Sequence, residues 1–355
     1  MNKTFLKVMV CCTLCTTISC SNHSETIIYS TDSLKNLTTK VVKPEKIPLD
    51  IQLTSPMQIE RVNDSLLIVF DADADKKCKL LNLKGTMVGE FAQLGHSKDE
   101  LISPVGISVE DGSIVNVYDY SKGELISYSI HDVMAGINNP HRITNVRRLL
   151  ENNKIVGTAI NFVQSLGSNR HLLFGNNQNR IMLLDGNIIK STYSNYPNTD
   201  SDEECNWAIW GHSVQYKLSP DTKHLILTTY IGSLFEIFNL NEGIVQTTIL
   251  KGFIPPKYNV VNGAIPKWIS PDGESPEGFY ALCASNNRFY ASIGGVDCGQ
   301  RDEIYSFDYE GNPEGKYLFP GDVKCFTQMN DSFFFIIENN SGEYGLYQAQ
   351  LPALK

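Results

Sequence analysis

The chain has 355 residues, and its 39 acidic side chains outnumber the 30 basic ones, which gives a formal net charge of −9. The acids are scattered, and no stretch carries the basic residues needed to hold a phosphate backbone, so nucleic acid is excluded as an expected partner. Beyond the first twenty residues, no apolar run is long enough to cross a membrane as a helix.

The N-terminus is typical of an export signal. Two lysines precede a short apolar stretch, which ends in Thr-Ile-Ser-Cys at residues 17–20. This tetrapeptide is similar to a bacterial lipobox, in which the cysteine is acylated and becomes the new N-terminus, although Thr stands where Leu is usual. We expect a signal peptide at 1–19 and a lipid on Cys20. The alternative is an ordinary secretory cleavage near Ser19.

Residues 20–45 are polar and rich in Ser, Thr, Asn and Lys, a composition typical of a tether between a lipid and a folded domain. Ser21 follows Cys20, in place of the Asp that holds enteric lipoproteins at the inner membrane. We therefore expect an exported protein that contacts the outer membrane only through its lipid anchor and faces the periplasm or the cell surface.

One pattern recurs six times after this segment: a polar turn, an apolar run, a variable loop and a second apolar run. Repeats of about 40–50 residues built from antiparallel strands indicate a propeller. We therefore expect one all-β domain over 46–355, a six-bladed β-propeller with four antiparallel strands in each blade. The six turns lie at 62–65, 110–113, 167–170, 219–222, 285–288 and 329–332.

Side chains alternate between polar and apolar within several of these runs, as in a strand with one face buried. The run Phe333–Ile337 is continuously apolar, which is expected where neighbouring blades cover both faces of a sheet. Residues 129–135 are expected to form one short helix. The segment TIIYS at 26–30 is either part of the tether or a strand that completes the last blade. The expected blades span roughly 46–100, 101–150, 151–200, 201–262, 263–320 and 321–355.

Five cysteines lie beyond the signal, and neither a zinc pair nor a dense disulfide scaffold fits their spacing. Cys283 and Cys298 flank one expected strand pair and are the best candidates for a bridge. The others are expected to be small buried side chains on strands. The five are Cys78, Cys205, Cys283, Cys298 and Cys325.

Several motifs resemble those of one family. GHSKDEL at 95–101, followed by PVGI at 104–107, is similar to the Gly-x-Gly-x-x-Glu-Leu and Pro-x-Gly-Ile junction of TolB-like six-bladed propeller lipoproteins of Bacteroides-type bacteria, with Ser97 in place of the second Gly. Tyr-Pro at 196–197, Leu-Ser-Pro-Asp at 218–221 and Ile-Tyr-Ser-Phe-Asp at 304–308 follow in the family's order. The resemblance implies a TolB-like or NHL-like propeller and an exported location, and it supplies no catalytic residues.

A weak metal candidate lies between two expected strands. Asp71, Asp73 and Asp75 resemble the opening of a calcium loop. A complete loop also needs Gly at its sixth position and Glu at its twelfth, where this chain has Lys76 and Asn82. We therefore expect no cofactor, with calcium as the weaker alternative.

No constellation typical of catalysis is present. The chain has seven histidines, but it has neither a nucleophile elbow nor a His-Glu-x-x-His helix. We expect a non-enzymatic binding protein. The alternative is a metal-dependent hydrolase or lyase of the lactonase or glycan-degrading type, with its residues at the propeller axis.

The best candidate for recognition is the segment 205–212, which holds two of the chain's three tryptophans. The propeller topology brings it to the face that carries the loops between second and third strands. Aromatic and Arg side chains there suit contact with a protein or glycan partner. The alternative is that the tryptophans plug the channel or pack between blades. The predicted contact residues are Trp207, Trp210, Arg180, Tyr230 and Arg301.

Overall fold

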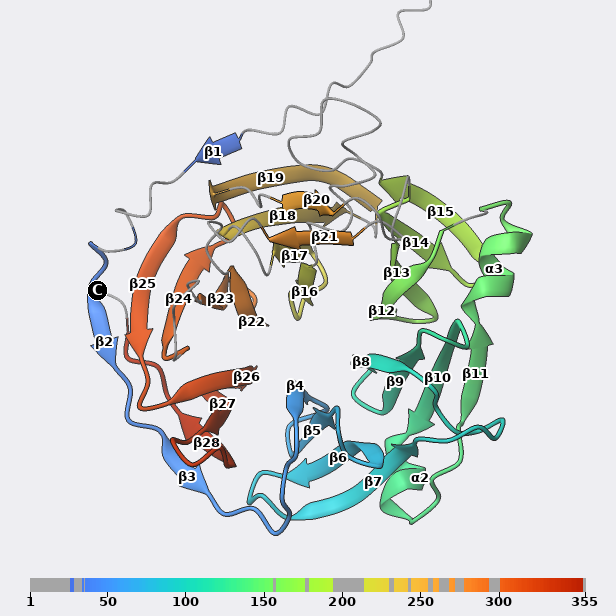
Figure 1. The fold of residues 1–355 in the computed structure, drawn as a ribbon, viewed down its shortest axis with the longest axis horizontal. Helices are drawn as coiled ribbons and strands as arrows, with labels where there is room; N and C mark the ends of the chain where they lie inside the picture. Colours follow the sequence, from blue (N-terminus) through green and yellow to red (C-terminus); the bar gives the residue numbers. More distant parts are fainter. Residues whose placement is uncertain are drawn as a thin grey trace, which may run out of the picture.

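Six antiparallel sheets surround a central axis in the computed structural model (Figure 1). The prediction of a six-bladed β-propeller with four-stranded blades is therefore confirmed. The signal peptide and Cys20 lie outside the described residues. These are 26–28, 34, 36–155, 158–175, 179–193, 214–229, 233–241, 244–254, 258–261, 268–271, 278–293 and 301–353.

The first three blades follow one another along the chain, each running from its innermost to its outermost strand. Blade 1 contains β4 (Pro56–Arg61), β5 (Leu66–Asp71), β6 (Lys76–Asn82) and β7 (Met87–Gln93). Blade 2 contains β8 (Pro104–Glu110), β9 (Ile114–Asp119), β10 (Glu124–Ser129) and β11 (Arg142–Asn145). Blade 3 contains β12 (Ile160–Gly167), β13 (Arg170–Gly175), β14 (Ile181–Asp185) and β15 (Ile188–Tyr193).

The other three blades complete the ring. Blade 4 contains β16 (Val214–Leu218), β17 (His224–Thr229), β18 (Ser233–Asn241) and β19 (Ile244–Ile254). A separate hairpin follows, formed by β20 (Tyr258–Val261) and β21 (Trp268–Pro271). Blade 5 contains β22 (Phe279–Ala284), β23 (Arg288–Ile293), β24 (Glu303–Asp308) and β25 (Pro313–Leu318). Blade 6 takes β26 (Asp322–Met329), β27 (Ser332–Glu338) and β28 (Tyr344–Ala349) from the end of the chain.

The strand that completes blade 6 comes from the N-terminal segment. It is β3 (Glu45–Ile47), which pairs antiparallel with β28. The alternative that residues 26–30 complete this blade is wrong. β1 (Thr26–Ile28) instead pairs parallel with β19 of blade 4. The reason is connectivity: β3 directly precedes β4, the inner strand of blade 1, just as β7 precedes β8 and β25 precedes β26.

The N-terminal segment contacts blade 5 as well. β2 (Thr39–Val41) pairs parallel with β25, so three short strands lie along the outer edges of three successive blades (Figure 1). Strands therefore lie within the stretch expected to be a tether. An outer strand left bare would expose unpaired N–H and C=O groups, and the added strands cover part of that edge.

The six repeated turns all connect the first strand of a blade to its second strand. Their residues adopt left-handed backbone conformations at Asp111, Ser168, Asn169, Thr222 and Asn330. Asn and Asp tolerate such conformations better than most other residues, which explains why these types recur at the turns. We name the surface that carries these six turns the turn face.

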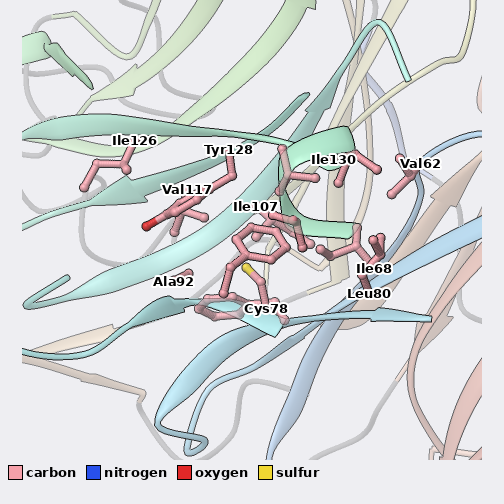
Figure 2. Close-up of a cluster of buried hydrophobic side chains, with 14 of the residues drawn as sticks. Val62, Ile68, Cys78, Leu80, Ala92, Ile107, Val117, Ile126, Tyr128 and Ile130 are labelled. Carbon is pink, nitrogen blue, oxygen red and sulfur yellow. The ribbon is translucent and has the colours of Figure 1, made fainter. Parts of the chain in front are cut away.

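Apolar side chains fill the spaces between neighbouring blades. Between blades 1 and 2, Cys78 belongs to the same apolar cluster as Ile107 and Tyr128 (Figure 2). Phe91 is part of this cluster, and its ring lies 4.7 Å from the ring of Tyr128. Full burial of one large apolar side chain contributes about 1.5–3 kcal/mol. The buried apolar side chains form separate clusters of this kind, so the hydrophobic core is divided among the interfaces between blades.

The described cysteines agree in part with their predictions. Cys78, Cys283 and Cys325 are free and buried, as expected for small side chains on strands. Because Cys283 is free, the predicted bridge to Cys298 is wrong. Burial raises the pKa of the Cys283 thiol to about 12, so the thiol stays protonated at neutral pH.

Two short helices lie on the rim of blade 2. The expected helix is α2 (Ile130–Met134), whose N-cap Ser129 accepts a hydrogen bond from the backbone of Asp132. α3 (Val146–Asn152) was not predicted from the sequence. Within the described ranges, no helix has the length and apolar character needed to cross a membrane.

Candidate functional site

The face opposite the turns carries the connections that differ most between blades. It bears the loops between second and third strands and the segments from each outer strand to the next inner strand. We name this surface the loop face. Its described parts are 48–55, 72–75, 94–103, 120–123, 146–155, 158–159, 179–180, 301–302, 319–321 and 339–343.

Arg180 does not reach a partner on this face. Its guanidinium forms a bidentate ion pair with Glu236 of β18, joining blades 3 and 4, with Nη1 2.9 Å from Oε1. The two side chains are only 4% and 5% exposed. This corrects the prediction that Arg180 is an exposed contact. Burying both charges requires such pairing, because an unpaired charge in this position is strongly unfavourable.

Arg301 lies on the loop face, as predicted. The Cζ atom of its guanidinium is 3.4 Å from the centre of the Tyr280 ring, within the range of a cation–π contact. In the part of the chain that the structure describes, no carboxylate forms an ion pair with Arg301. Its planar donor groups therefore remain able to bind a carboxylate or phosphate. Trp207, Trp210 and Tyr230 lie outside the described residues, so their part in recognition stays a prediction.

The three aspartates proposed as weak metal ligands have different surroundings. Asp71 is fully buried and accepts hydrogen bonds from Thr54 Oγ1 at 2.8 Å and Ser55 N at 2.6 Å. It therefore fixes the chain where it enters blade 1, whereas Asp73 and Asp75 are exposed. Among the described residues, no group of three His, Cys, Asp or Glu side chains is arranged to hold a metal ion.

Asp119 performs the corresponding task in blade 2. It also ends a second strand, and its carboxylate accepts hydrogen bonds from Ile102 N at 2.6 Å and Lys122 N at 3.0 Å. Asp71 and Asp119 thus occupy the same position in their blades. In the sequence, each follows directly after an apolar run, LLIVF or IVNVY, and this repeated Asp was a detectable signal for the role. These acids organise the loop face.

The inner strands of all six blades surround the axis (Figure 1). An ion pair crosses this channel: Lys217 Nζ of β16 lies 2.5 Å from Glu60 Oε1 of β4. Gln58 Nε2 donates to the same Glu60 oxygen at 2.9 Å. The Gln58 amide also exchanges hydrogen bonds with Ile107 N and O at 3.0 and 2.8 Å, which joins blades 1 and 2. The pair separates the channel into two parts.

Each part of the channel contains a cavity. The cavity toward the turn face has a volume of about 310 Å³, and Glu60 and Lys217 contribute to its lining. The cavity toward the loop face has about 130 Å³ and shares the same two residues. Five aromatic residues also line it, namely Phe70, Phe162, Tyr216, Tyr280 and Phe326. The loop-face cavity thus combines aromatic surfaces with one acid and one base.

Phe162 and Tyr216 form one aromatic wall of the loop-face cavity, and stacking between blades 3 and 4 holds this wall in place. The Tyr216 ring is parallel to Phe174, with centres 4.2 Å apart and an angle of 8°. Phe162 lies 4.6 Å from Tyr216 on the same wall. Such offset contacts contribute about 0.5–1.5 kcal/mol beyond area burial. The wall is therefore preorganised.

Exposed apolar side chains lie beside the cavity on the loop face. Met57 is 62% exposed and Val105 is 44% exposed, and both line the loop-face cavity. Ile102 and Tyr120 are also exposed. Tyr120 N donates to Ser103 O, which places these two near each other. We name Met57, Ile102, Val105 and Tyr120 the apolar row. Large apolar groups gathered on one surface are typical of interaction sites.

Sequence reasoning missed the residues of the channel. Gln58 and Glu60 in β4, and Gln215 and Lys217 in β16, are polar residues two positions apart. That spacing directs both members of each pair to the same side of an inner strand. Polar alternation in the first strand of a blade was the available signal.

Comparisons with solved structures found proteins similar to this chain. A protein from Bacteroides fragilis described as exported has a solved structure with a TM-score of 0.54 at 10% identity, and the match covers 92% of this chain and 97% of that one. The β-propeller domain of Cps50 (Swd1) from Myceliophteria thermophila has a TM-score of 0.49 at 11% identity, covering 87% and 100%. A luciferin-regenerating enzyme gives 0.49 at 10% identity, covering 88% and 97%. These similarities concern the fold.

The sequence comparisons identify the family. No curated protein sequence matches the chain. The family described as TolB-like 6-blade propeller-like matches residues 33–331, which is most of the propeller. The chain therefore belongs to the TolB-like six-bladed β-propeller family.

Proposed function

We propose that this protein is an exported, lipid-anchored binding protein that recognises a protein or glycan partner through its loop face and performs no catalysis. The observation that carries the proposal is the apolar row beside the aromatic cavity and Arg301. Apolar anchors with an Arg at their edge are typical of interface hot spots. On the turn face, the connections between first and second strands are short polar turns, and the longer connection 130–141 of blade 2 exposes Met134 and Ile137 there.

Export is supported by two independent observations. The first is the charged and apolar N-terminus that ends in Cys20. The second is the structural similarity to a Bacteroides fragilis protein described as exported. We place the protein at the outer membrane, with its propeller on the periplasmic or cell-surface side.

The binding proposal is tested by placing a charge in the apolar row. Met57→Glu is expected to weaken capture of envelope proteins or glycans by about tenfold or more, because a carboxylate would have to be desolvated at the contact. Ile188→Glu is the matched control, since Ile188 is 57% exposed and lies at the start of β15, away from the loop face. Equal binding by both variants would contradict the proposal.

A further inference from the structure

We propose that the loop-face cavity binds the terminal acidic sugar of a glycan, with its hydroxyl groups bonded to Glu60 and Lys217 and its carboxylate paired with Arg301. This inference rests on the proposed function and specifies which partner chemistry the loop face recognises.

The size of the cavity limits how much of a ligand can enter. Its volume is about 130 Å³. For comparison, a cavity of about 150 Å³ lined by apolar side chains holds one benzene molecule. The loop-face cavity is smaller than that, so a sugar ring would enter it by one edge and project through its opening. The exposure of Met57 and Val105 at its edge shows that the cavity opens on the loop face, so the rest of a chain can extend outward.

The walls suit a ring with an apolar face. Phe162 and Tyr216 present aromatic surfaces from blades 3 and 4, and Tyr280 presents one from blade 5. A pyranose carries C–H groups on its faces and hydroxyls at its edge. Binding sites of this kind place aromatic side chains around a small number of polar groups that determine orientation. The cavity has this composition.

Glu60 and Lys217 form the floor of the loop-face cavity, and they require a ligand group that both donates and accepts hydrogen bonds. Glu60 Oε1 already accepts from Gln58 and Lys217, whereas Glu60 Oε2 has no partner among the described side chains. Lys217 has three N–H donors, and Glu60 is its ion-pair partner in the described structure. The two side chains remain 17% and 15% exposed. A hydroxyl can accept from Lys217 and donate to Glu60 Oε2, whereas an apolar ligand would leave Glu60 Oε2 and the remaining Lys217 N–H donors without a partner.

Arg301 supplies the preference for an acidic sugar. Its guanidinium lies against Tyr280, which lines the cavity, and it has no carboxylate partner in the described chain. Two parallel N–H donors of a guanidinium match the two oxygens of a carboxylate, and such pairs are stronger than neutral hydrogen bonds. A uronic acid whose ring enters the cavity beside Tyr280 can therefore extend its carboxylate to Arg301.

Calorimetric titration of the full mature protein tests the assignment. D-Glucuronate and D-galacturonate are the probes, with D-glucose and D-galactose as their uncharged counterparts. We expect at least one uronate to bind about tenfold more tightly than its counterpart, a difference of about 1.4 kcal/mol. Arg301→Gln should remove this difference, and Arg301→Lys should restore only part of it, because Lys lacks the planar fork. Arg170→Gln, which makes the same charge change on the turn face, should bind as the wild type.

The contribution of the floor is tested with Glu60→Gln combined with Lys217→Gln. This double variant removes both charges together, so it leaves no unpaired ion in the channel. It should weaken binding of charged and uncharged sugars alike by about tenfold. Melting temperatures of all variants verify that they are folded.

Three results would overturn the inference. Equal affinity for a uronate and its uncharged counterpart would remove the role of Arg301, and unchanged affinity in the double variant would remove the role of the floor. If none of the four sugars binds at millimolar concentration while partner capture still depends on Met57, the sugar site is wrong and the proposed function stands. If uronates bind in the cavity but Met57→Glu captures the partner as well as the wild type does, the proposed function is wrong in assigning partner contact to the apolar row.

Discussion

Glu60 and Lys217 are 157 positions apart in the sequence, and their side chains meet at 2.5 Å across the propeller axis. They belong to the inner strands of blades 1 and 4, which lie opposite each other in the ring (Figure 1). The contact ties the two halves of the propeller together at its centre. Because Glu60 and Lys217 line both channel cavities, the ion pair forms the inner boundary of each.

The first prediction concerns this ion pair. Lys217→Met should lower the free energy of unfolding by about 3 kcal/mol, because it leaves the largely buried Glu60 carboxylate without its cation. The double variant Glu60→Gln with Lys217→Gln should lose much less, since it leaves no charge behind. Urea unfolding followed by tryptophan fluorescence measures both. Equal losses for the two variants would show that the pair contributes through packing rather than charge.

The second prediction concerns Arg180, which was expected to contact a partner and instead pairs with Glu236. Arg180→Met should destabilise the protein by about 3–5 kcal/mol, because Glu236 would remain buried and unpaired. The exposed Arg148 provides the control, and Arg148→Met should change stability by less than about 0.5 kcal/mol. Thermal and urea unfolding measure the difference, and partner capture by folded Arg180→Met should be unchanged.

The third prediction concerns mild acid and His171. Burial lowers the pKa of His171, with Glu110 opposing the effect and Arg142 adding to it, and its Nδ1 has no hydrogen-bond partner among the described residues. A depressed pKa means that the unfolded chain binds a proton more readily than the native one. The stability from this group is therefore present above its ordinary value of 6.5 and is lost as pH falls below it.

Unfolding measured at several pH values tests this. The wild type should lose more stability between pH 7 and pH 5 than His171→Gln does. His131→Gln, which changes an exposed histidine, should retain the wild-type pH dependence. Parallel pH profiles for the wild type and His171→Gln would contradict the assignment.

Glu110 also has a lowered pKa: burial opposes this shift, and hydrogen bonds from Asn116 and Arg142 outweigh it. The stability that Glu110 contributes is therefore lost only at pH values below the ordinary pKa of a glutamate, which is lower than the range in which His171 acts.

The fourth prediction concerns the lipid anchor. Cells that express the wild type and are grown with labelled palmitate should incorporate label into this protein, and Cys20→Ala should abolish the incorporation. Cys15→Ala serves as the control, because Cys15 lies inside the expected signal peptide and should be dispensable for labelling. Label that persists in Cys20→Ala would show that Cys20 is not the acylated residue.

The local parts of the fold could be predicted from the sequence because they depend on neighbouring residues. Each turn between a first and second strand combines Asn, Asp, Gly or Ser with an apolar run directly after it, and those features suffice to locate a hairpin. The helix at Ile130–Met134 has its N-cap Ser129 one position earlier. α3 carried the same kind of signal, with Asn145 before Val146, Leu149 and Leu150, but its length of seven residues gave little periodicity to detect.

The features that depend on distant residues could not be predicted in the same way. Whether Arg180 is exposed depends on Glu236, 56 positions later and in another blade. The channel ion pair likewise requires knowledge of which blades face each other. The choice between Thr26–Ile28 and Glu45–Ile47 as the strand that completes blade 6 depended on ring connectivity, because both segments are short and each is able to pair as a strand.

The pairing of β3 with β28 also orders the events of biosynthesis. The ribosome makes Glu45–Ile47 about 300 residues before Tyr344–Ala349, yet these two strands lie side by side in the finished ring. No intermediate chain length can close the circle, since an early strand must wait for the last one. Loss of the hairpin formed by β27 and β28 would leave β26 and β3 without their strand partners in blade 6, and it would expose the apolar faces that blades 1 and 5 turn toward that blade.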